Sequence, residues 1–353
     1  MSPITERKNI TMKDVAQRAG VHLSSVSVVL NGSRSSAGIS EINRQRIVDA
    51  AQELGYRRNG SAHTIRTGKC GNIALLLSPL RSHSYLPMPL LAGLHDSLEQ
   101  ADMSLTFCLL EDEELHQSDV LPKFLRERMC DGLLVDYNLR IPRSILESIR
   151  HHQIPAVWIN SKQAADCVYP DDFDAAKRAT RHLLELGHRR IVYANFASKP
   201  DDLHYSSADR CEGYRVAMCD AGLEPQTWGL EMAGADSIEK CQRQLDTRER
   251  PTAIVGYATY AFDGISYAAA RLGMRVPDDL SIVTFGPEPT DYMCRPLTLM
   301  LEPQYQMGCL ATQMIRRKIE HPDQPLAPTA VPFTWEAGQS SAAFTGAGRN
   351  QRE

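Results

Sequence analysis

Residues 21–34 read VHLSSVSVVLNGSR, and this stretch decides how the N-terminal part of the chain folds. Val26, Val29 and Leu30 lie on one side of a short helix, which Asn31-Gly32 would end. A helix this small buries little apolar surface by itself. It is either a minor core helix or a helix presented to a binding partner, and the neighbouring segments decide between the two.

Two further helical patterns flank this stretch. One begins at Thr11, with Asp14 three residues later as in a capping box, and ends at Gly20. The other begins at Ser40 and ends at Gly55, in a left-handed turn that suits glycine. Its expected apolar stripe is Ile42, Ile47, Val48, Ala51 and Leu54. Two helices joined by a tight turn and followed by a third form a helix-turn-helix, whose second helix enters the major groove of DNA.

The charge of the chain is unevenly distributed. Residues 1–71 carry an excess of six positive charges, although the whole chain of 353 residues has a net charge of −4. A basic head on an acidic body indicates that the head binds a polyanion. A solvated charged face would give the same count, so the charge alone leaves both readings open.

Composition excludes several classes of protein. No apolar run approaches the ~18 residues of a membrane span, and the N-terminus lacks the apolar core of a signal peptide. The nine cysteines include no Cys-x-x-Cys pair, which favours isolated thiols over a metal site or disulfide framework. We therefore expect a cytoplasmic protein with no membrane attachment, no cofactor and no bound metal.

From residue 72 onward, strand-like and helix-like segments alternate. Strands are expected at residues 72–79, 104–111, 131–137, 155–160, 189–196, 251–257 and 280–286, and helices at 90–101, 124–129, 143–152, 174–188, 210–222 and 261–273. Such alternation, with nearly continuous apolar strands, predicts parallel sheets covered by helices on both faces. The length predicts two subdomains, with a ligand cleft outside the carboxyl ends of the strands.

These segments together resemble the lactose-repressor (LacI/GalR) family of bacterial transcriptional regulators. The head carries TMKDVAQRAGVHLSSVSVVLNGS, ISEINRQRIVDAAQELGYRRN and IRTG, and the body carries LLELGHRRI, RCEGY, PTAIV, LGMRVPDDLSIVTFG and LEPQYQMGCLATQMI in order. The resemblance implies an all-α helix-turn-helix head, a hinge helix, and an α/β body of two parallel-sheet subdomains like a periplasmic binding protein. It also implies a homodimeric repressor that binds double-stranded, pseudo-palindromic operator DNA and a small-molecule effector.

The resemblance divides the chain into a head (1–58), a hinge (59–70), a body (71–345) and a tail (346–353). Within the body, residues 71–189 with 291–322 would form one subdomain, and residues 190–290 with 323–345 the other.

Matching positions imply a set of DNA contacts in the head and hinge. The residues are Thr11, His22, Leu23, Ser24, Ser25, Ser27, Asn31, Arg34, Asn59, Ala62 and Ile65. Leu23 and Ser24 would read base edges, whereas Ser25 and Ser27 would hold phosphates. Val28 stands where the family usually has arginine, which predicts weaker binding or a different operator centre.

The hinge reads NGSAHTIRTG, and Ile65 occupies the position of the family's intercalating leucine, beside Ala62. Gly60 lowers its helix propensity by roughly 1 kcal/mol relative to alanine. We expect the hinge to fold only on DNA, and an inert linker is the alternative.

The same matching gives candidate effector contacts. They are His83, Tyr85, Trp158, Asn160, Asp171, Arg210, Tyr257 and Tyr260. Sugar-sensing members usually place acidic or amide groups where this chain has Ala258, Thr259, Gly286 and Pro287. The site therefore looks less acidic than a sugar site, with Arg210 lacking opposing aspartates. That pattern suggests a sugar derivative, including an acidic or phosphorylated one; a structural ion pair is the alternative role for Arg210, and a core position for Trp158.

Two other classes share features with this chain. A transporter's solute-binding protein would have the same body, but it would need a signal peptide and no helix-turn-helix. An enzyme would need a catalytic motif, and the sequence has no strand-following Gly-rich phosphate loop, Gly-x-Ser-x-Gly or His-Glu-x-x-His. The sequence thus predicts a regulator and not an enzyme.

Overall fold

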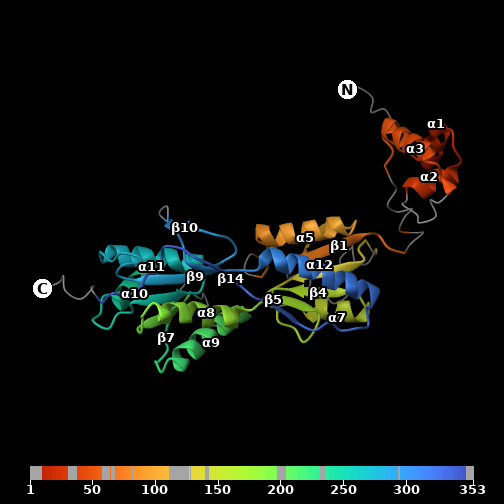
Figure 1. Cartoon of the computed structure of the whole chain (residues 1–353). Coiled ribbons are helices and arrows are strands. Elements are labelled where there is room, and N and C mark those ends of the chain that lie inside the picture. The colour runs from red at the N-terminus through yellow and green to blue at the C-terminus, as the bar shows by residue number, and fades with distance from the viewer. Residues whose placement is uncertain are drawn as a thin grey trace, which may run out of the picture. The chain divides into compact units, whose positions relative to one another are not determined.

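The computed structural model describes residues 10–30, 38–57, 64, 68–80, 83–110, 127, 129–139, 143–196, 204–230, 235–292 and 295–346. The chain divides into two compact units, residues 1–70 and 71–353 (Figure 1). Within the described residues, no helix has the length and apolarity needed to cross a bilayer.

The N-terminal unit contains three helices, α1 (Met12–Ala19), α2 (Leu23–Leu30) and α3 (Glu41–Leu54). Thr11 and Asp14 form the predicted capping box at the start of α1. Gly20 and Gly55 take the left-handed conformation after α1 and α3, with φ of 65° and 64°. Ser40 caps α3, accepting from the backbone amide of Asn43. The predicted boundaries of these two helices are confirmed.

A small apolar core holds the three helices together. Val15, Val26 and Ile47, one from each helix, are fully buried in it. Ile42 was expected in the apolar stripe of α3, but it is 74% exposed. That expectation is wrong, because the α3 residues that reach the core, Ile47, Ala50, Ala51 and Leu54, all lie beyond its first turn.

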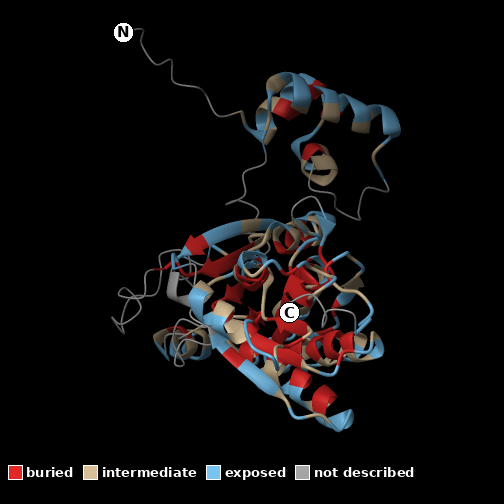
Figure 2. Cartoon of the chain, turned by 90° about the vertical axis from the view of Figure 1, so that its left-hand side faces the viewer, coloured by how far each residue is buried: buried red, intermediate tan, exposed pale blue. Residues whose placement is uncertain are grey.

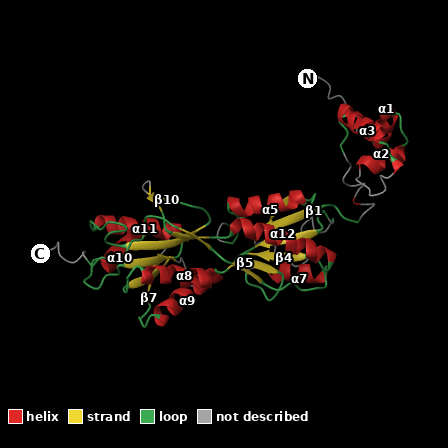
Figure 3. Cartoon of the chain, in the orientation of Figure 1, coloured by secondary structure: helices red, strands yellow, loops and turns green. Residues whose placement is uncertain are grey.

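The first sheet of the body has the strand order β13-β5-β4-β3-β1-β2, and all its strand pairs are parallel. Its strands are β1 (Asn72–Leu77), β2 (Ser104–Leu109), β3 (Gly132–Asp136), β4 (Ala156–Ile159), β5 (Cys167–Pro170) and β13 (Thr329–Val331). Helices α5 (Met88–Gln100) and α12 (Gln304–Glu320) cover one face, and α7 (Arg143–His151) covers the other (Figure 3). The helix expected at residues 124–129 falls largely outside the described residues.

Helices α5 and α12 approach each other closely at two glycines. A Cβ atom at Gly93 would lie 2.1 Å from the backbone oxygen of Tyr305, and one at Gly308 would lie 2.6 Å from that of Leu90. Side chains larger than hydrogen do not fit at either position. The two glycines therefore fix the spacing of this helix pair.

The second sheet has the order β14-β12-β9-β8-β6-β7 and is parallel except for the β12–β14 pair. Its strands are β6 (Ile191–Phe196), β7 (Gln226–Leu230), β8 (Ala253–Gly256), β9 (Ser281–Gly286), β12 (Leu299–Leu301) and β14 (Thr334–Glu336). Helices α8 (Asp172–Glu185) and α9 (Tyr205–Asp220) cover one face, and α10 (Ala235–Leu245) and α11 (Thr259–Arg271) the other. Two short strands, β10 (Asp291–Tyr292) and β11 (Arg295–Pro296), pair separately. Figure 2 shows buried residues concentrated along the strands of the body.

The chain passes between the two sheets three times: after β5, after β12, and between β13 and β14. The expected subdomain boundaries are therefore wrong in three places. Helix α8 packs on the second sheet and β12 belongs to it, whereas β13 belongs to the first. The chain changes sheet directly after a strand ends, so the helix or strand that follows packs on the other sheet. Strand β7, strands β10 to β14 and helices α10 and α12 were not among the expected segments.

Candidate functional site

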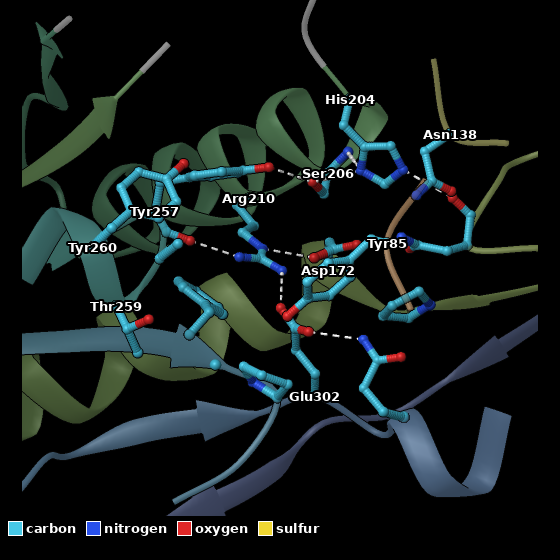
Figure 4. A pocket seen from close by; sticks show the side chains of 17 residues that line it. Tyr85, Asn138, Asp172, His204, Ser206, Arg210, Tyr257, Thr259, Tyr260 and Glu302 are labelled. Atoms are coloured by element: carbon cyan, nitrogen blue, oxygen red, sulfur yellow. Dashed lines mark hydrogen bonds and ion pairs between the residues drawn. The ribbon is translucent and has the colours of Figure 1, made fainter. Parts of the chain in front are cut away.

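A cavity of about 340 Å³ opens among the carboxyl-end segments of both sheets. Its volume lies within the range of roughly 300–1,000 Å³ typical of small-molecule sites. The lining residues are Tyr85, Asn138, Asn160, Pro170, Asp172, His204, Ser206, Arg210, Tyr257, Ala258, Thr259, Tyr260, Phe285, Gly286, Pro287, Glu302 and Gln304. Figure 4 shows Arg210 among these side chains, with dashed lines to Asp172, Glu302 and the backbone of Tyr257.

Arg210 is the centre of a buried ionic network. Its Nε donates to Asp172 Oδ1 at 2.6 Å, and its Nη2 donates to Glu302 Oε1 at 3.2 Å. Its Nη1 donates to the backbone oxygen of Tyr257 at 2.6 Å. The Arg210 side chain is only 5% exposed, and the Asp172 side chain is fully buried. Each nitrogen of the guanidinium group is thus already engaged by the protein.

Aromatic rings surround the same guanidinium group. Its central carbon lies 4.4 Å from the ring centre of Phe285, 5.0 Å from that of Tyr257 and 5.6 Å from that of Phe333. These distances permit cation–π attraction. The rings therefore help to stabilise the charge that burial would otherwise disfavour.

Burial and charge oppose each other in the Arg210–Asp172 pair. Burial by itself lowers the pKa of Arg210, but the charges of Asp172 and Glu302 outweigh it and raise that pKa above its ordinary value. Burial raises the pKa of Asp172 to about 6, although Arg210 acts to lower it. At neutral pH the pair is therefore ionised on both sides.

A chain of hydrogen bonds links Asn160, which follows a strand of the first sheet, to the second sheet. His204 Nε2 lies 2.8 Å from the backbone oxygen of Asn160, which can only accept, so Nε2 carries the proton. His204 Nδ1 then accepts from the Ser206 hydroxyl at 2.8 Å. The Ser206 oxygen in turn accepts from the Tyr257 hydroxyl at 2.8 Å. Burial lowers the pKa of His204 to about 4, so this ring is neutral at physiological pH.

The structure brings most of the expected effector residues to this cavity and leaves three out. Tyr85, Asn160, Arg210, Tyr257 and Tyr260 line it. The other three are His83, Trp158 and Asp171. Trp158 is buried under α7 in the apolar cluster of the first sheet, His83 lies against the ring of Tyr137, and Asp171 caps α8 by accepting from the Asp174 amide.

The prediction that Arg210 has no opposing acidic side chains is wrong. Arg210 has two opposing carboxylates, and neither Asp172 nor Glu302 was among the expected contacts. Both come from crossovers, at the start of α8 and directly after β12, and the interaction with Arg210 follows only from the fold. The positions expected to lack acids, including Gly286 and Pro287, do line the cavity. The other residues missed were Asn138, Pro170, His204, Ser206, Phe285 and Gln304.

The start of α2 is exposed in the N-terminal unit. Leu23 is 38% exposed, and His22 and Ser24 are also exposed, whereas Val26 one turn later is fully buried. His22 Nδ1 lies 2.8 Å from the Ser24 hydroxyl, and Thr11 lies at the cap of α1. Ser25 and Ser27 are half-buried on the same helix. The remaining expected DNA contacts, Asn31, Arg34, Asn59, Ala62 and Ile65, lie outside the described residues.

Both parts of the chain match known protein families. The family of bacterial regulatory proteins named after lacI matches residues 11–59, and the periplasmic binding protein-like domain matches residues 180–341. The HTH-type transcriptional regulator DegA of Bacillus subtilis (strain 168) is 30% identical over 314 residues, which cover 84% of this chain and 88% of DegA. The chain belongs to the lacI family.

A further relative is similar in sequence, and a solved structure is similar in fold. The HTH-type transcriptional repressor PurR of Photobacterium profundum is 24% identical over 318 residues, covering 88% of this chain and 92% of PurR. The crystal structure of the lac repressor dimer bound to operator and the anti-inducer ONPF has a TM-score of 0.73 at 19% identity, covering 95% of this chain and 100% of that one. This lacI-family chain is therefore a regulatory protein and not an enzyme.

Proposed function

We propose that the chain is a ligand-responsive transcriptional repressor that acts in the cytoplasm and binds a pseudo-palindromic operator as a homodimer. The proposal depends on the observation that one chain combines two features: an exposed helix-turn-helix, and a pocket lined by residues from two sheets between which the chain crosses three times. The first part suits DNA, because a short helix exposed at its N-terminal end fits the major groove. The second suits a small effector of about the size of a sugar or sugar derivative.

The pocket lining supports a link between effector and operator. Asp172 and Glu302 lie at two of the three crossovers, so an occupant touches the segments about which the two sheets would rotate. Rotation would change the separation of the two heads in a dimer and hence the affinity for a two-site operator. Ligand and DNA must then change each other's affinity by the same factor.

Selection of duplexes from a random DNA pool by the full chain tests the proposal. We expect a palindromic motif whose centre is lost or relaxed when the selection is repeated with Ile65→Ala, because that side chain is proposed to wedge into the central step. Ile42→Ala removes an exposed isoleucine of the head and should retain the whole motif. Absence of any enriched motif, with and without effector candidates, would contradict sequence-specific repression.

A further inference from the structure

Two buried oxygens beside the pocket lack hydrogen-bond donors. Asp172 uses Oδ1 for Arg210, and its Oδ2 has no partner among the described residues. Gln304 donates from Nε2 to Glu302 Oε2 at 2.8 Å, and its Oε1 is likewise unpartnered in the described part of the chain. Asp172 is 1% exposed and Gln304 2%. A buried acceptor without a donor is destabilising. Both side chains line the pocket, so a small shift of either one toward an occupant with N–H or O–H groups would satisfy its oxygen.

The charges that line the pocket leave a negative excess. The guanidinium group of Arg210 faces the carboxylates of Asp172 and Glu302, and His204 is neutral at physiological pH. An anionic ligand would have to compete with one of these carboxylates for Arg210. It would also meet the remaining negative charge in a site where water screens little. The ionic network therefore opposes anions although it contains an arginine.

The surrounding hydroxyl and aromatic groups also disfavour an anionic ligand. The Tyr257 hydroxyl donates to Ser206, so toward any other partner it can only accept. The rings of Tyr257 and Tyr260 lie with their centres 6.4 Å apart, and Tyr85 completes the aromatic lining. Aromatic faces attract cations. Carboxylates, acceptor oxygens and aromatic faces together favour a cationic donor.

We infer that the pocket selects a small ligand with several hydrogen-bond donors and no negative charge, and that it binds the protonated amine of such a ligand more tightly than its neutral hydroxyl parent. This inference rests on the proposed function only in taking the pocket as the effector site. It replaces the acidic or phosphorylated ligand that the sequence suggested.

Matched sugars test the charge preference directly. The probes are glucosamine, glucose and glucose 6-phosphate, with the corresponding galactose and mannose series, each titrated into the full chain at neutral pH and followed by calorimetry and thermal unfolding. We expect the amine to bind more tightly than the neutral sugar, and the phosphate to bind at least about tenfold more weakly, in every series that binds. Tighter binding of any phosphate than of its parent, or no binding by any amine or neutral sugar, would overturn the inference.

Glu302→Gln tests the physical cause. This variant removes one negative charge and leaves Asp172 as the carboxylate facing Arg210, so it should lose the preference for the amine and bind the phosphates about tenfold more tightly than the wild type does. Glu212→Gln on α9 is the matched control, because Glu212 pairs with Arg215 on the surface and its side chain is 51% exposed. It should leave the order of affinities unchanged.

A second variant guards against a folding defect in Glu302→Gln. Gln304→Leu removes one unpartnered acceptor, together with the Nε2 donor to Glu302, without altering charge. It should weaken the binding of the amine and the neutral sugar alike, with the phosphate still the weakest ligand. If this variant binds the amine and the neutral sugar as tightly as the wild type does, the ligand does not need hydrogen-bond donors at this position. Operator binding by the same preparations separates the two proposals: loss of specific DNA binding refutes the repressor, whereas a reversed charge order with intact DNA binding refutes only the inference.

Discussion

Asp172 and Glu302 lie at two different crossovers between the sheets, and both bind the guanidinium group of Arg210. Phe333, at the third crossover, lies 5.6 Å from the same group. One side chain of α9 therefore contacts all three connections of the body.

Replacing Arg210 should strongly destabilise the body. Arg210→Met leaves two buried carboxylates without their cation, for which we expect a loss of about 3–5 kcal/mol in the free energy of unfolding. Urea denaturation followed by fluorescence measures it. Arg215→Met, on the same helix but half-exposed and paired with Glu212 at the surface, should have a far smaller effect, because solvent screens that pair. Equal losses in both variants would show that the buried network contributes no more stability than the surface pair.

The pH dependence of stability should include a contribution from His204. Its pKa falls from an ordinary 6.5 to about 4 on folding, mainly through burial, with Arg210 lowering it and Asp209 and the Asn160 carbonyl raising it. A histidine with a lowered folded-state pKa contributes stability that is present above pH 6.5 and lost as the pH falls towards 4. The maximum effect is about 3 kcal/mol.

Urea unfolding at a series of pH values checks this effect. His204→Gln should lose less stability than the wild type between pH 6.5 and pH 4, because the variant has no ring to protonate. His95→Gln is the control, since His95 is 67% exposed on α5, and it should follow the wild-type curve. Parallel curves for all three proteins would refute the assignment of a neutral, hydrogen-bonded His204.

Val28→Arg should strengthen DNA binding. Val28 is a half-buried residue of α2, and an arginine there would add one charged contact to the basic head. A single added phosphate contact makes the slope of log affinity against log salt steeper by about 0.9. Fluorescence anisotropy with the selected operator at several salt concentrations measures it. Val28→Gln, which adds length without charge, should leave the slope unchanged, and a steeper slope for glutamine would contradict the electrostatic explanation.

Gly308→Ala should disrupt the contact between α5 and α12. The added Cβ would lie 2.6 Å from the backbone of both Leu90 and Leu94, so the helices must separate, at a cost of about 1–3 kcal/mol. Thermal unfolding gives the comparison with wild type. Gly229→Ala serves as the control, because its Cβ would meet nothing within 4 Å. If Gly229→Ala lost stability and Gly308→Ala did not, the close approach of α5 and α12 would not hold in solution.

The secondary structure of the head and much of the body could be predicted because its signals are local. Capping residues such as Thr11 and Ser40, and glycines such as Gly20 and Gly55, act on backbone within a few residues of themselves. The crossovers could not be predicted in the same way. Whether a strand such as β13 joins the first or second sheet depends on pairing with β5, which lies far away in sequence.

Part of the site was predictable because some of its residues directly follow strand ends. Asn160 and Tyr257 come directly after β4 and β8, and both reach the pocket. Trp158 lies inside β4, where strand alternation turns it toward α7. The pairing of Arg210 with Asp172 and Glu302 is a property of three segments brought together by folding, so no spacing in the sequence reveals that the arginine is neutralised.

The position of Arg210 also bears on how such a regulator could acquire a new effector. A substitution at Arg210 would alter the pocket and all three crossovers at once, so a change of specificity there would also change the response to ligand. Tyr85 and Tyr260 line the same pocket but are 39% and 40% exposed. New specificity should therefore arise more readily at these two tyrosines, where the chemistry of the ligand can vary while the mechanism of signalling is retained.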